Sequence, residues 1–270
     1  MENILESVFM KEFGMLTDKL YSNGWHERNS GNISVLMDEA DVLKYMSNNL
    51  VKRTIELDFA VPSLKGKHLL VTASGKYLKN VTRNPELSTG VIRIHEDGHK
   101  ADVLWGFSDG GNPTSELSTH LQTHVARLSV DKTHKVVIHT HATNIMAMTF
   151  VHELEDKSFT KTLWKMCTES IVVFPDGVGV LPWMVCGNSD IGAATAKKML
   201  EHKLVVWAMH GIFATGCSLD DTFGLIETVE KSAQIYLMIK NKDQINEITD
   251  EQLKQLTSFF NVTYKKGYLD

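Results

Sequence analysis

Three histidines in this 270-residue chain have the types and spacing of a metal site. His139 and His141 follow the apolar run 136–138, and alternate residues of a strand point to the same face. His210 comes after a second apolar run, 204–207, and just before Gly211. Three protein ligands with one open position are typical of catalytic zinc. The spacing therefore predicts a zinc site at two strand ends, with hydrogen-bonded core histidines as the alternative.

Glu116 is the carboxylate with the best position for proton chemistry. It follows Thr114 and Ser115 where a helix is expected to begin, and the positive end of the helix dipole stabilises a carboxylate there. Glu116 could act only as a helix cap, or as a general acid and base beside a metal. The local sequence leaves both roles open. His120 and His124 continue from Glu116 at i+4 spacing. This stripe could be a site, but we interpret it as a solvated helix face.

The remaining histidines and the cysteines do not indicate a second site. The three cysteines are odd in number, far apart and without a C-x-x-C pair. A disulfide framework is therefore not expected, and a metal would be bound by histidine. Seven histidines stand singly in turns or at polar positions, and we interpret them as surface or locally hydrogen-bonded residues: His26, His68, His95, His99, His134, His152 and His202.

Three short segments could hold a phosphate group or could be ordinary turns. They combine small hydroxyl or amide side chains with glycines that let the backbone approach a ligand closely. None of them is a G-x-x-x-x-G-K-[ST] loop, so a nucleoside triphosphate is not implied. The segments are Asn29-Ser30-Gly31-Asn32, Ser74-Gly75-Lys76 and Thr114-Ser115.

Composition and charge narrow the class of protein. The chain is 43% hydrophobic and 23% charged, as in ordinary globular proteins. A net charge of −5 gives no general attraction to phosphate backbones, which argues against nucleic-acid binding. Apolar runs are far shorter than the roughly 18 residues of a membrane span. The N-terminus lacks the basic-then-apolar layout of a signal peptide, so we expect a cytoplasmic protein without a membrane partner.

The first half of the chain predicts helices and hairpin strands. Apolar residues at 3–4 spacing indicate an amphipathic helix over 4–20. Strands are expected at 33–36 and 69–72, with an irregular insertion over about 37–66 between them. Residues 91–94 and 101–105 flank Asp97-Gly98 and predict a hairpin. Pro113-Thr114-Ser115-Glu116 opens a helix, with Ser115 or Thr114 as its N-cap.

The second half alternates apolar strands with helices. Strands are expected at 136–138, 171–174 and 204–207, with a helix over about 191–202 between the last two. Ser218-Leu219-Asp220-Asp221 resembles a capping box and starts a long helix to residue 239, and Thr249 caps a last short helix. No linker or repeat interrupts the chain. The prediction is one α/β domain over residues 1–270, a mixed sheet covered by helices in three layers.

Taken in order, these segments resemble the class II aldolase/adducin family. The run Gly31-Asn32-Ile33-Ser34 is followed by Ser74-Gly75, Thr114-Ser115-Glu116, His139-Thr140-His141 and His210-Gly211, and the match covers about residues 25–240. Further similar features are Gly24-Trp25-x-Glu27-Arg28-Asn29, Leu104-Trp105-Gly106, Val173-Phe174-Pro175-Asp176-Gly177-Val178-Gly179, Leu181-Pro182-Trp183-Met184 and Asp221-Thr222-Phe223-Gly224-Leu225-Ile226. The resemblance implies an α/β/α fold with a central mixed, mainly antiparallel sheet, and a homotetramer.

The resemblance also implies a role for each candidate site residue. His139, His141 and His210 would hold one Zn²⁺ per subunit, and Glu116 would be the acid/base. The substrate phosphate would be surrounded by Asn29, Gly31, Asn32, Ser74, Gly75, Thr114 and Ser115. Glu169 matches a family carboxylate that would reach the site of a neighbouring subunit.

The implied activity is reversible retro-aldol cleavage of a ketose 1-phosphate to dihydroxyacetone phosphate and an aldehyde. Zinc would act as a Lewis acid on the resulting carbanion, and Glu116 would return a proton to the carbanion carbon. One alternative is a different enzyme on the same scaffold. It could be an epimerase or a dehydratase, with an aldolase for L-fuculose 1-phosphate and an epimerase for L-ribulose 5-phosphate as the specific candidates. The other is a non-enzymatic adducin-like binding module, which would be expected to have lost ligands.

Overall fold

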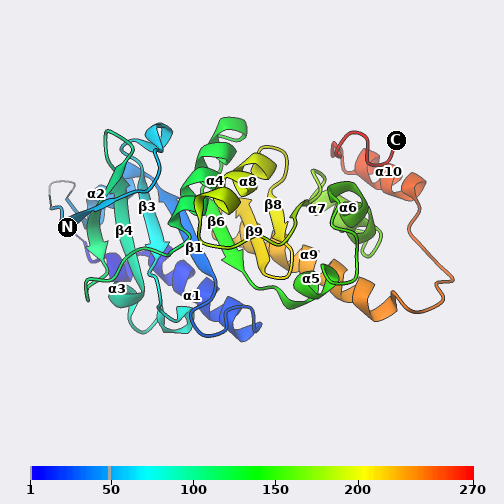
Figure 1. The fold of residues 1–270 in the computed structure, drawn as a ribbon, viewed down its shortest axis with the longest axis horizontal. Helices are drawn as coiled ribbons and strands as arrows, with labels where there is room; N and C mark the ends of the chain where they lie inside the picture. Colours follow the sequence, from blue (N-terminus) through cyan, green and yellow to red (C-terminus); the bar gives the residue numbers. More distant parts are fainter. Residues whose placement is uncertain (1, 48–49) are drawn as a thin grey trace.

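The computed structural model describes residues 2–47 and 50–270. Within them, nine strands form one sheet (Figure 1). All neighbouring strands are antiparallel except the β7–β8 pair. The order across the sheet is β2 (Arg53–Glu56), β5 (Lys100–Gly106), β4 (Thr89–Ile94), β3 (His68–Thr72), β1 (Asn32–Met37), β6 (Val136–Thr140), β9 (Gly211–Gly216), β8 (Leu204–Trp207) and β7 (Gly179–Leu181). The predicted mixed, mainly antiparallel sheet is confirmed.

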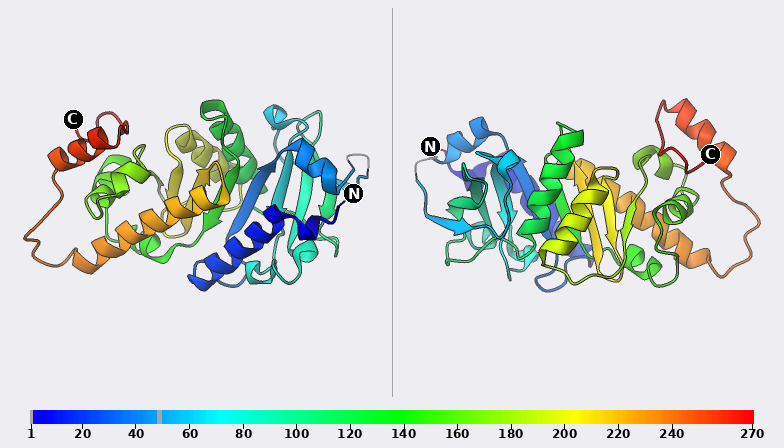
Figure 2. Two further views of the ribbon diagram at one scale, coloured as in Figure 1. Left: turned by 180° about the vertical axis from the view of Figure 1, so that it is seen from behind. Right: turned by 45° about the horizontal axis from the view of Figure 1, so that its top comes forward.

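Helices cover both faces of the sheet and make three layers. Figure 2 shows α1 (Val8–Ser22) and α9 (Leu219–Ile239) on one side and α4 (Leu117–Val130) and α8 (Ser189–Met199) on the other. The shorter elements are α2 (Glu39–Tyr45), α3 (Pro85–Ser88), α5 (Thr143–Met148), α6 (Asp156–Trp164), α7 (Ser170–Val173) and α10 (Asp250–Phe259), with 3₁₀ turns at Ile4–Glu6, Pro62–Leu64 and Leu78–Asn80. The three-layer α/β/α prediction is confirmed.

Side chains that alternate along the strands provide apolar residues to the core on both faces of the sheet. Ile138 of β6 belongs to the same buried cluster as Phe13 and Leu20 of α1. Its neighbour Val137 belongs to the cluster on the other face, with Phe213 of β9. Because successive side chains of a strand point to opposite faces, β6 is apolar on both sides. Each fully buried large apolar side chain contributes roughly 1.5–3 kcal/mol to the free energy of unfolding.

Two predicted segments are wrong in their secondary structure. Residues 171–174, expected as a strand, lie at α7, and the strand of this region is β7 at Gly179–Leu181. A four-residue apolar run has the same pattern in a buried strand and in one helical turn. The insertion over 37–66 is not irregular, because it contains α2 and β2, and β2 extends the sheet beside β5. Residues 48 and 49 of that insertion lie outside the described residues.

Helix starts are confirmed where a side chain accepts a backbone N–H. The Ser218 hydroxyl accepts from Asp221 N at the start of α9, and Thr249 forms a full capping box with Gln252 at α10. The start of α4 differs from the prediction, because its N-cap position is Glu116 rather than Thr114 or Ser115. Residues 114–117 form a separate turn, in which Leu117 N donates to Thr114 O at 3.1 Å. This turn places Glu116 at the N-terminal end of α4.

The structure contains further elements that the sequence did not predict. The helices α5 and α6 and the strand β9 were not expected. No helix among the described residues is long and apolar enough to span a membrane. A single domain over residues 1–270 stays a prediction, supported by the sheet that runs through most of the chain (Figure 1).

Candidate active site

One pocket collects the predicted site residues. Strand β1 is antiparallel to both β3 and β6, so the start of β1 lies beside the ends of the other two. A pocket of about 240 Å³ opens there, at the start of α4. Its lining residues are Asn29, Ser30, Gly31, Asn32, Ala73, Ser74, Gly75, Thr114, Ser115, Glu116, His139, His141 and His210. The metal, acid/base and phosphate candidates therefore all line the same cavity. Glu169, which the resemblance places at a neighbouring subunit's site, does not line it.

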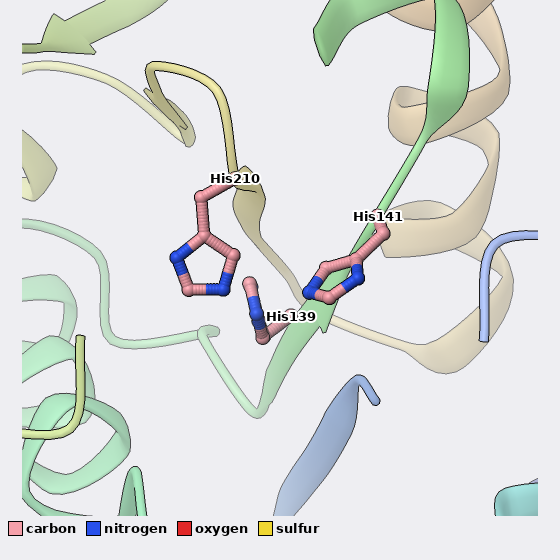
Figure 3. A group of neighbouring side chains, drawn as sticks. All are labelled: His139, His141 and His210. Carbon is pink, nitrogen blue, oxygen red and sulfur yellow. The ribbon is translucent and has the colours of Figure 1, made fainter. Parts of the chain in front are cut away.

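The three predicted metal ligands converge in this pocket (Figure 3). Their ligand atoms all lie within 4.8 Å of one another, and the His139 ring centroid is 5.3 Å from that of His141 and 5.0 Å from that of His210. His139 is on β6, and His210 lies in the turn between β8 and β9. The pairing of His139 with Phe213 of β9 brings that turn beside the end of β6.

Hydrogen bonds orient two of the imidazoles. The Nδ1 atom of His139 lies 2.9 Å from the carbonyl oxygen of Ile212, and Nδ1 of His141 lies 2.7 Å from Glu27 Oε1. Each Nδ1–H donates to its acceptor, and each Nε2 is therefore left with a lone pair for a metal. Burial and the neighbouring histidines lower the pKa of His139 well below its usual value. His139 is consequently neutral, which is the ligating form.

Glu27 is a functional residue that the sequence analysis missed. It lies in the turn between α1 and β1. The motif Gly24-Trp25-x-Glu27-Arg28-Asn29 includes it among the features of the family resemblance, but no role was assigned to it. Burial raises the pKa of Glu27 and the hydrogen bond from His141 lowers it, with a net lowering. The carboxylate therefore stays ionised and fixes the His141 ring, as acidic partners of metal-bound histidines do.

The Glu116 carboxylate points into the pocket. Glu116 occupies the N-cap position of α4, but its side chain makes no capping bond. Its Oε2 atom accepts a hydrogen bond from Asn32 Nδ2 at 2.8 Å and lies 3.6 Å from His139 Nε2. A buried carboxyl group this close to three imidazoles can move a proton on a bound substrate. The geometry therefore favours acid/base chemistry over capping alone.

The two glycines and the start of α4 at this pocket suit a small anion. Gly31 and Gly75 have positive φ values of 71° and 70°, and α4 begins just beyond Thr114 and Ser115. A hydrogen bond from Thr114 N to Thr72 O at 2.9 Å holds the segment before α4 against the end of β3. Backbone N–H groups, hydroxyls and the positive end of a helix dipole together attract a phosphate.

Several histidine predictions need correction. His120 and His124 are fully buried beneath α4 and do not form a solvated face. His26, His68, His134 and His202 are also buried rather than on the surface. The locally hydrogen-bonded alternative holds for His202, whose Nδ1 lies 2.7 Å from Asp176 O, and for His134, whose Nε2 lies 2.9 Å from His124 Nδ1. The i+4 spacing places His120 and His124 on one face of α4, but it does not tell whether that face packs against the sheet or lies in solvent.

Two further residues differ in their relation to the pocket. Glu169 is exposed at the N-cap of α7 and is not among the residues that line the pocket. Cys186 lies in the loop before α8, and its sulfur groups with ligand atoms of Glu116 and His210, all within 4.8 Å. Sequence reasoning gave Cys186 no role, since a lone cysteine carries no spacing signal.

Known proteins with similar sequences and folds lead to one family. The family model for the Class II Aldolase and Adducin N-terminal domain matches residues 12–237. The chain is 52% identical over 270 residues to the rhamnulose-1-phosphate aldolase of Listeria monocytogenes serotype 4a, covering 100% of this chain and 99% of that protein. It is 46% identical over 269 residues to the rhamnulose-1-phosphate aldolase of Enterococcus faecalis, covering 99% and 96%. The solved sugar-phosphate aldolase from Thermotoga maritima matches with a TM-score of 0.75 at 26% identity, covering 88% and 97%.

Proposed function

Because the chain belongs to the class II aldolase and adducin family, we propose that it is a zinc-dependent aldolase for L-rhamnulose 1-phosphate. The products are dihydroxyacetone phosphate and L-lactaldehyde, and the reaction is reversible. Full-length relatives named rhamnulose-1-phosphate aldolase, at 43–52% identity, support this substrate. The observation that carries the proposal is the convergence of three histidines and Glu116 in one pocket.

The three histidines fit a zinc ion. Imidazole nitrogens are zinc ligands, their ligand atoms lie within 4.8 Å of one another, and burial keeps His139 neutral. His139, His141 and His210 would hold one ion per chain. When bound, Zn²⁺ supplies a Lewis acid that stabilises the negative charge on the carbonyl and hydroxyl oxygens of the substrate.

Glu116 carries the proton of the reaction. Cleavage removes the proton of the C4 hydroxyl and breaks the C3–C4 bond of the ketose, so that C4 leaves as the aldehyde carbon and the electron pair remains on C3. Glu116 in its protonated form then gives a proton to C3, so the net change moves one proton from the C4 hydroxyl to C3, and Glu116 removes the C3 proton in synthesis. The hydrogen bond from Asn32 Nδ2 to Glu116 Oε2 holds the carboxyl group in place, so that it does not need to be ordered during the reaction.

The substrate phosphate is bound in the same pocket. The seven candidates for this role all line it: Asn29, Gly31, Asn32, Ser74, Gly75, Thr114 and Ser115. Their amide, hydroxyl and backbone N–H groups bind the phosphate oxygens beside the start of α4. Because the phosphate is remote from the C3–C4 bond, its binding energy positions the reacting carbon. No nucleic acid is needed as a partner.

We also propose a cytoplasmic homotetramer. Glu169 is exposed and does not line the pocket of its own chain, which leaves it free to reach the site of a neighbouring subunit. Sedimentation velocity of the purified protein measures the assembly. A monomer that retains full activity would contradict both the tetramer and the role of Glu169.

An aldolase assay tests the function. Zinc-loaded enzyme should release dihydroxyacetone phosphate from L-rhamnulose 1-phosphate faster than from L-fuculose 1-phosphate, and a chelator should abolish the release. Glu116→Gln keeps the shape and the oxygen that accepts from Asn32. This variant should lower kcat by about 10²–10⁴-fold while the zinc content stays at one per chain. Absence of product with zinc-loaded enzyme would refute the aldolase, and a chain that binds no zinc would favour a non-enzymatic binding module.

A further inference from the structure

A row of buried polar side chains leads away from Glu116 between α4 and the sheet. The Asn32 amide donates to Glu116, and its oxygen contacts His120 Nε2. The Ser34 hydroxyl lies 2.7 Å from His120 Nδ1 and 2.8 Å from His124 Nε2. The row ends at His134, whose Nε2 is 2.9 Å from His124 Nδ1. All six residues are less than a tenth exposed.

The spacing of two elements builds this row. Asn32 and Ser34 are alternate residues of β1, and His120 and His124 are one turn apart on α4. Two residues along a strand advance about 6.7 Å, and four residues along a helix advance about 6 Å. The two pairs therefore stay in step where α4 crosses the sheet. Asn32 pairs with His139 across the β1–β6 ladder, which connects the row to the metal candidates.

One direction of hydrogen bonding satisfies the entire row. A carboxylate only accepts, so Asn32 Nδ2 donates to Glu116 and Asn32 Oδ1 accepts from His120 Nε2–H. Burial lowers the pKa of His120 to about 3 and that of His134 to about 4, and it lowers the pKa of His124 well below its usual value. Each ring is therefore neutral and has a single N–H.

The remaining bonds follow from those single protons. Since His120 donates through Nε2, its Nδ1 accepts from the Ser34 hydroxyl. The Ser34 oxygen then accepts from His124 Nε2–H, and His124 Nδ1 accepts from His134 Nε2–H. Every donor in the row points toward Glu116. Hydrogen bonds aligned in this way polarise one another, so the last donor, the Asn32 amide, is strengthened.

We propose that Ser34, His120, His124 and His134 are positioning residues that orient the Asn32 amide and hold the Glu116 carboxyl group through one directed row of hydrogen bonds. This inference rests on the proposed function, in which Glu116 transfers the proton. The four residues lie outside the pocket lining. They act through Asn32 and not on the substrate, so a break in the row should lower kcat and leave KM nearly unchanged.

A pair of His124 variants tests the row by kinetics. His124→Met fills a similar volume but cannot donate to Ser34, and kcat should fall about tenfold, the effect that one hydrogen bond can account for. His124→Gln retains an N–H donor and should stay within about twofold of the parent enzyme. Thr123→Val is the matched control, a buried neighbour on α4 whose hydroxyl has no partner in the described residues. A wild-type kcat in His124→Met, or equal losses in both His124 variants, would overturn the proposal.

Neutron diffraction of the deuterated parent protein locates the hydrogen atoms of the row directly, and it does not depend on the folding of a variant. Deuterium should be found on Nε2 and not on Nδ1 of His120, His124 and His134. Deuterium on Nδ1 of His120 or His124 reverses the row and would overturn the inference. If the parent protein instead lacks activity on L-rhamnulose 1-phosphate, the proposed function fails, while the neutron map still decides whether the row is directed at Glu116.

Discussion

The proposed metal site depends on groups that are not ligands themselves. The Nδ1 atom of His139 is held by the Ile212 carbonyl, and that of His141 by Glu27. Each bond selects one tautomer and presents Nε2 to the cluster. His210 supplies the third nitrogen from a turn in which Met209 has a positive φ of 63°. Correct ligand types alone would leave the rings free to rotate.

Glu27→Ala should therefore weaken zinc binding without removing a ligand. Loss of an acidic partner to a metal-bound histidine typically costs about 10–100-fold in metal affinity. Competition against a chromogenic zinc chelator measures the affinity. Glu247→Ala, an exposed residue far along the chain, is the control and should bind zinc as the parent does. An unchanged affinity in Glu27→Ala would show that His141 is oriented by other contacts.

The contrast between Glu27 and the ligands shows what the sequence could predict about the site. His139 and His141 were predictable because two positions on a strand fix a shared face. Glu116 was predictable as a carboxylate at a helix start, whereas the local sequence left both capping and acid/base chemistry open. Glu27 is 114 positions from its partner His141, and no local pattern reports a pairing over that distance. The buried row beyond Asn32 was hidden for the same reason.

At the scale of elements, the sheet determines which distant residues meet. Strand β9 starts and ends with glycine, and its apolar run was not recognised as a partner of β6. The β8–β9 turn nevertheless carries His210 to the end of β6. Likewise, β2 was hidden in a segment without periodicity, and its pairing with β5 could be found only in the structure. Strand pairing is non-local, whereas the capping residues Ser218 and Thr249 act locally and were predictable.

The turn before β1 packs against a buried histidine and also carries residues that line the pocket. Gly31 has a φ of +71°, and a Cβ atom built there would lie 2.3 Å from the His26 ring. Gly31→Ala should cost about 1–2 kcal/mol from the backbone conformation, and displacement of the buried His26 ring should add to this cost. We expect a lower melting temperature and a higher KM, because the turn also carries Asn29 and leads directly into Asn32 of β1.

Gly66→Ala separates the two causes. Gly66 has nearly the same φ of +70°, but an added Cβ would meet nothing within 4 Å, and the residue is remote from the pocket. This control should show only the backbone cost and an unchanged KM. Thermal unfolding and steady-state kinetics measure both variants. Equal losses of stability in the two variants would show that contact with His26 does not matter.

At the scale of the whole molecule, the acidic surface and the buried histidines have separate roles. A net charge of −5 repels polyanions, so a small phosphate must be attracted by local groups at the pocket. Composition predicts no general attraction of polyanions, but it does not report on the interior, where His120, His124 and His134 lie neutral between α4 and the sheet. Their effect on the molecule is a dependence of global stability on pH.

The free energy of unfolding should fall as the pH drops from about 6.5 to about 4. Burial, with the nearby Arg127, lowers the pKa of His134 to about 4, while Asp131 opposes this shift. Burial also lowers the pKa of His124, which faces His134 and His120. In this interval the unfolded chain binds protons that the folded chain excludes, so acid favours unfolding. Each such histidine contributes a slope of about 1.4 kcal/mol per pH unit.

Denaturant unfolding at pH 7 and pH 5, with a chelator present throughout, measures this slope. His134→Gln removes one titrating ring and should reduce the loss of unfolding free energy between pH 7 and pH 5 by about 2 kcal/mol, because the slope of about 1.4 kcal/mol per unit applies only below the unfolded pKa of about 6.5. This difference should hold even if the variant is less stable at pH 7. His99→Gln, at an exposed position, should keep the parent slope. Because the other histidines are common to all three proteins, the difference in slope isolates His134. A His134→Gln slope equal to that of the parent would show that His134 is protonated in the folded state, contrary to this prediction.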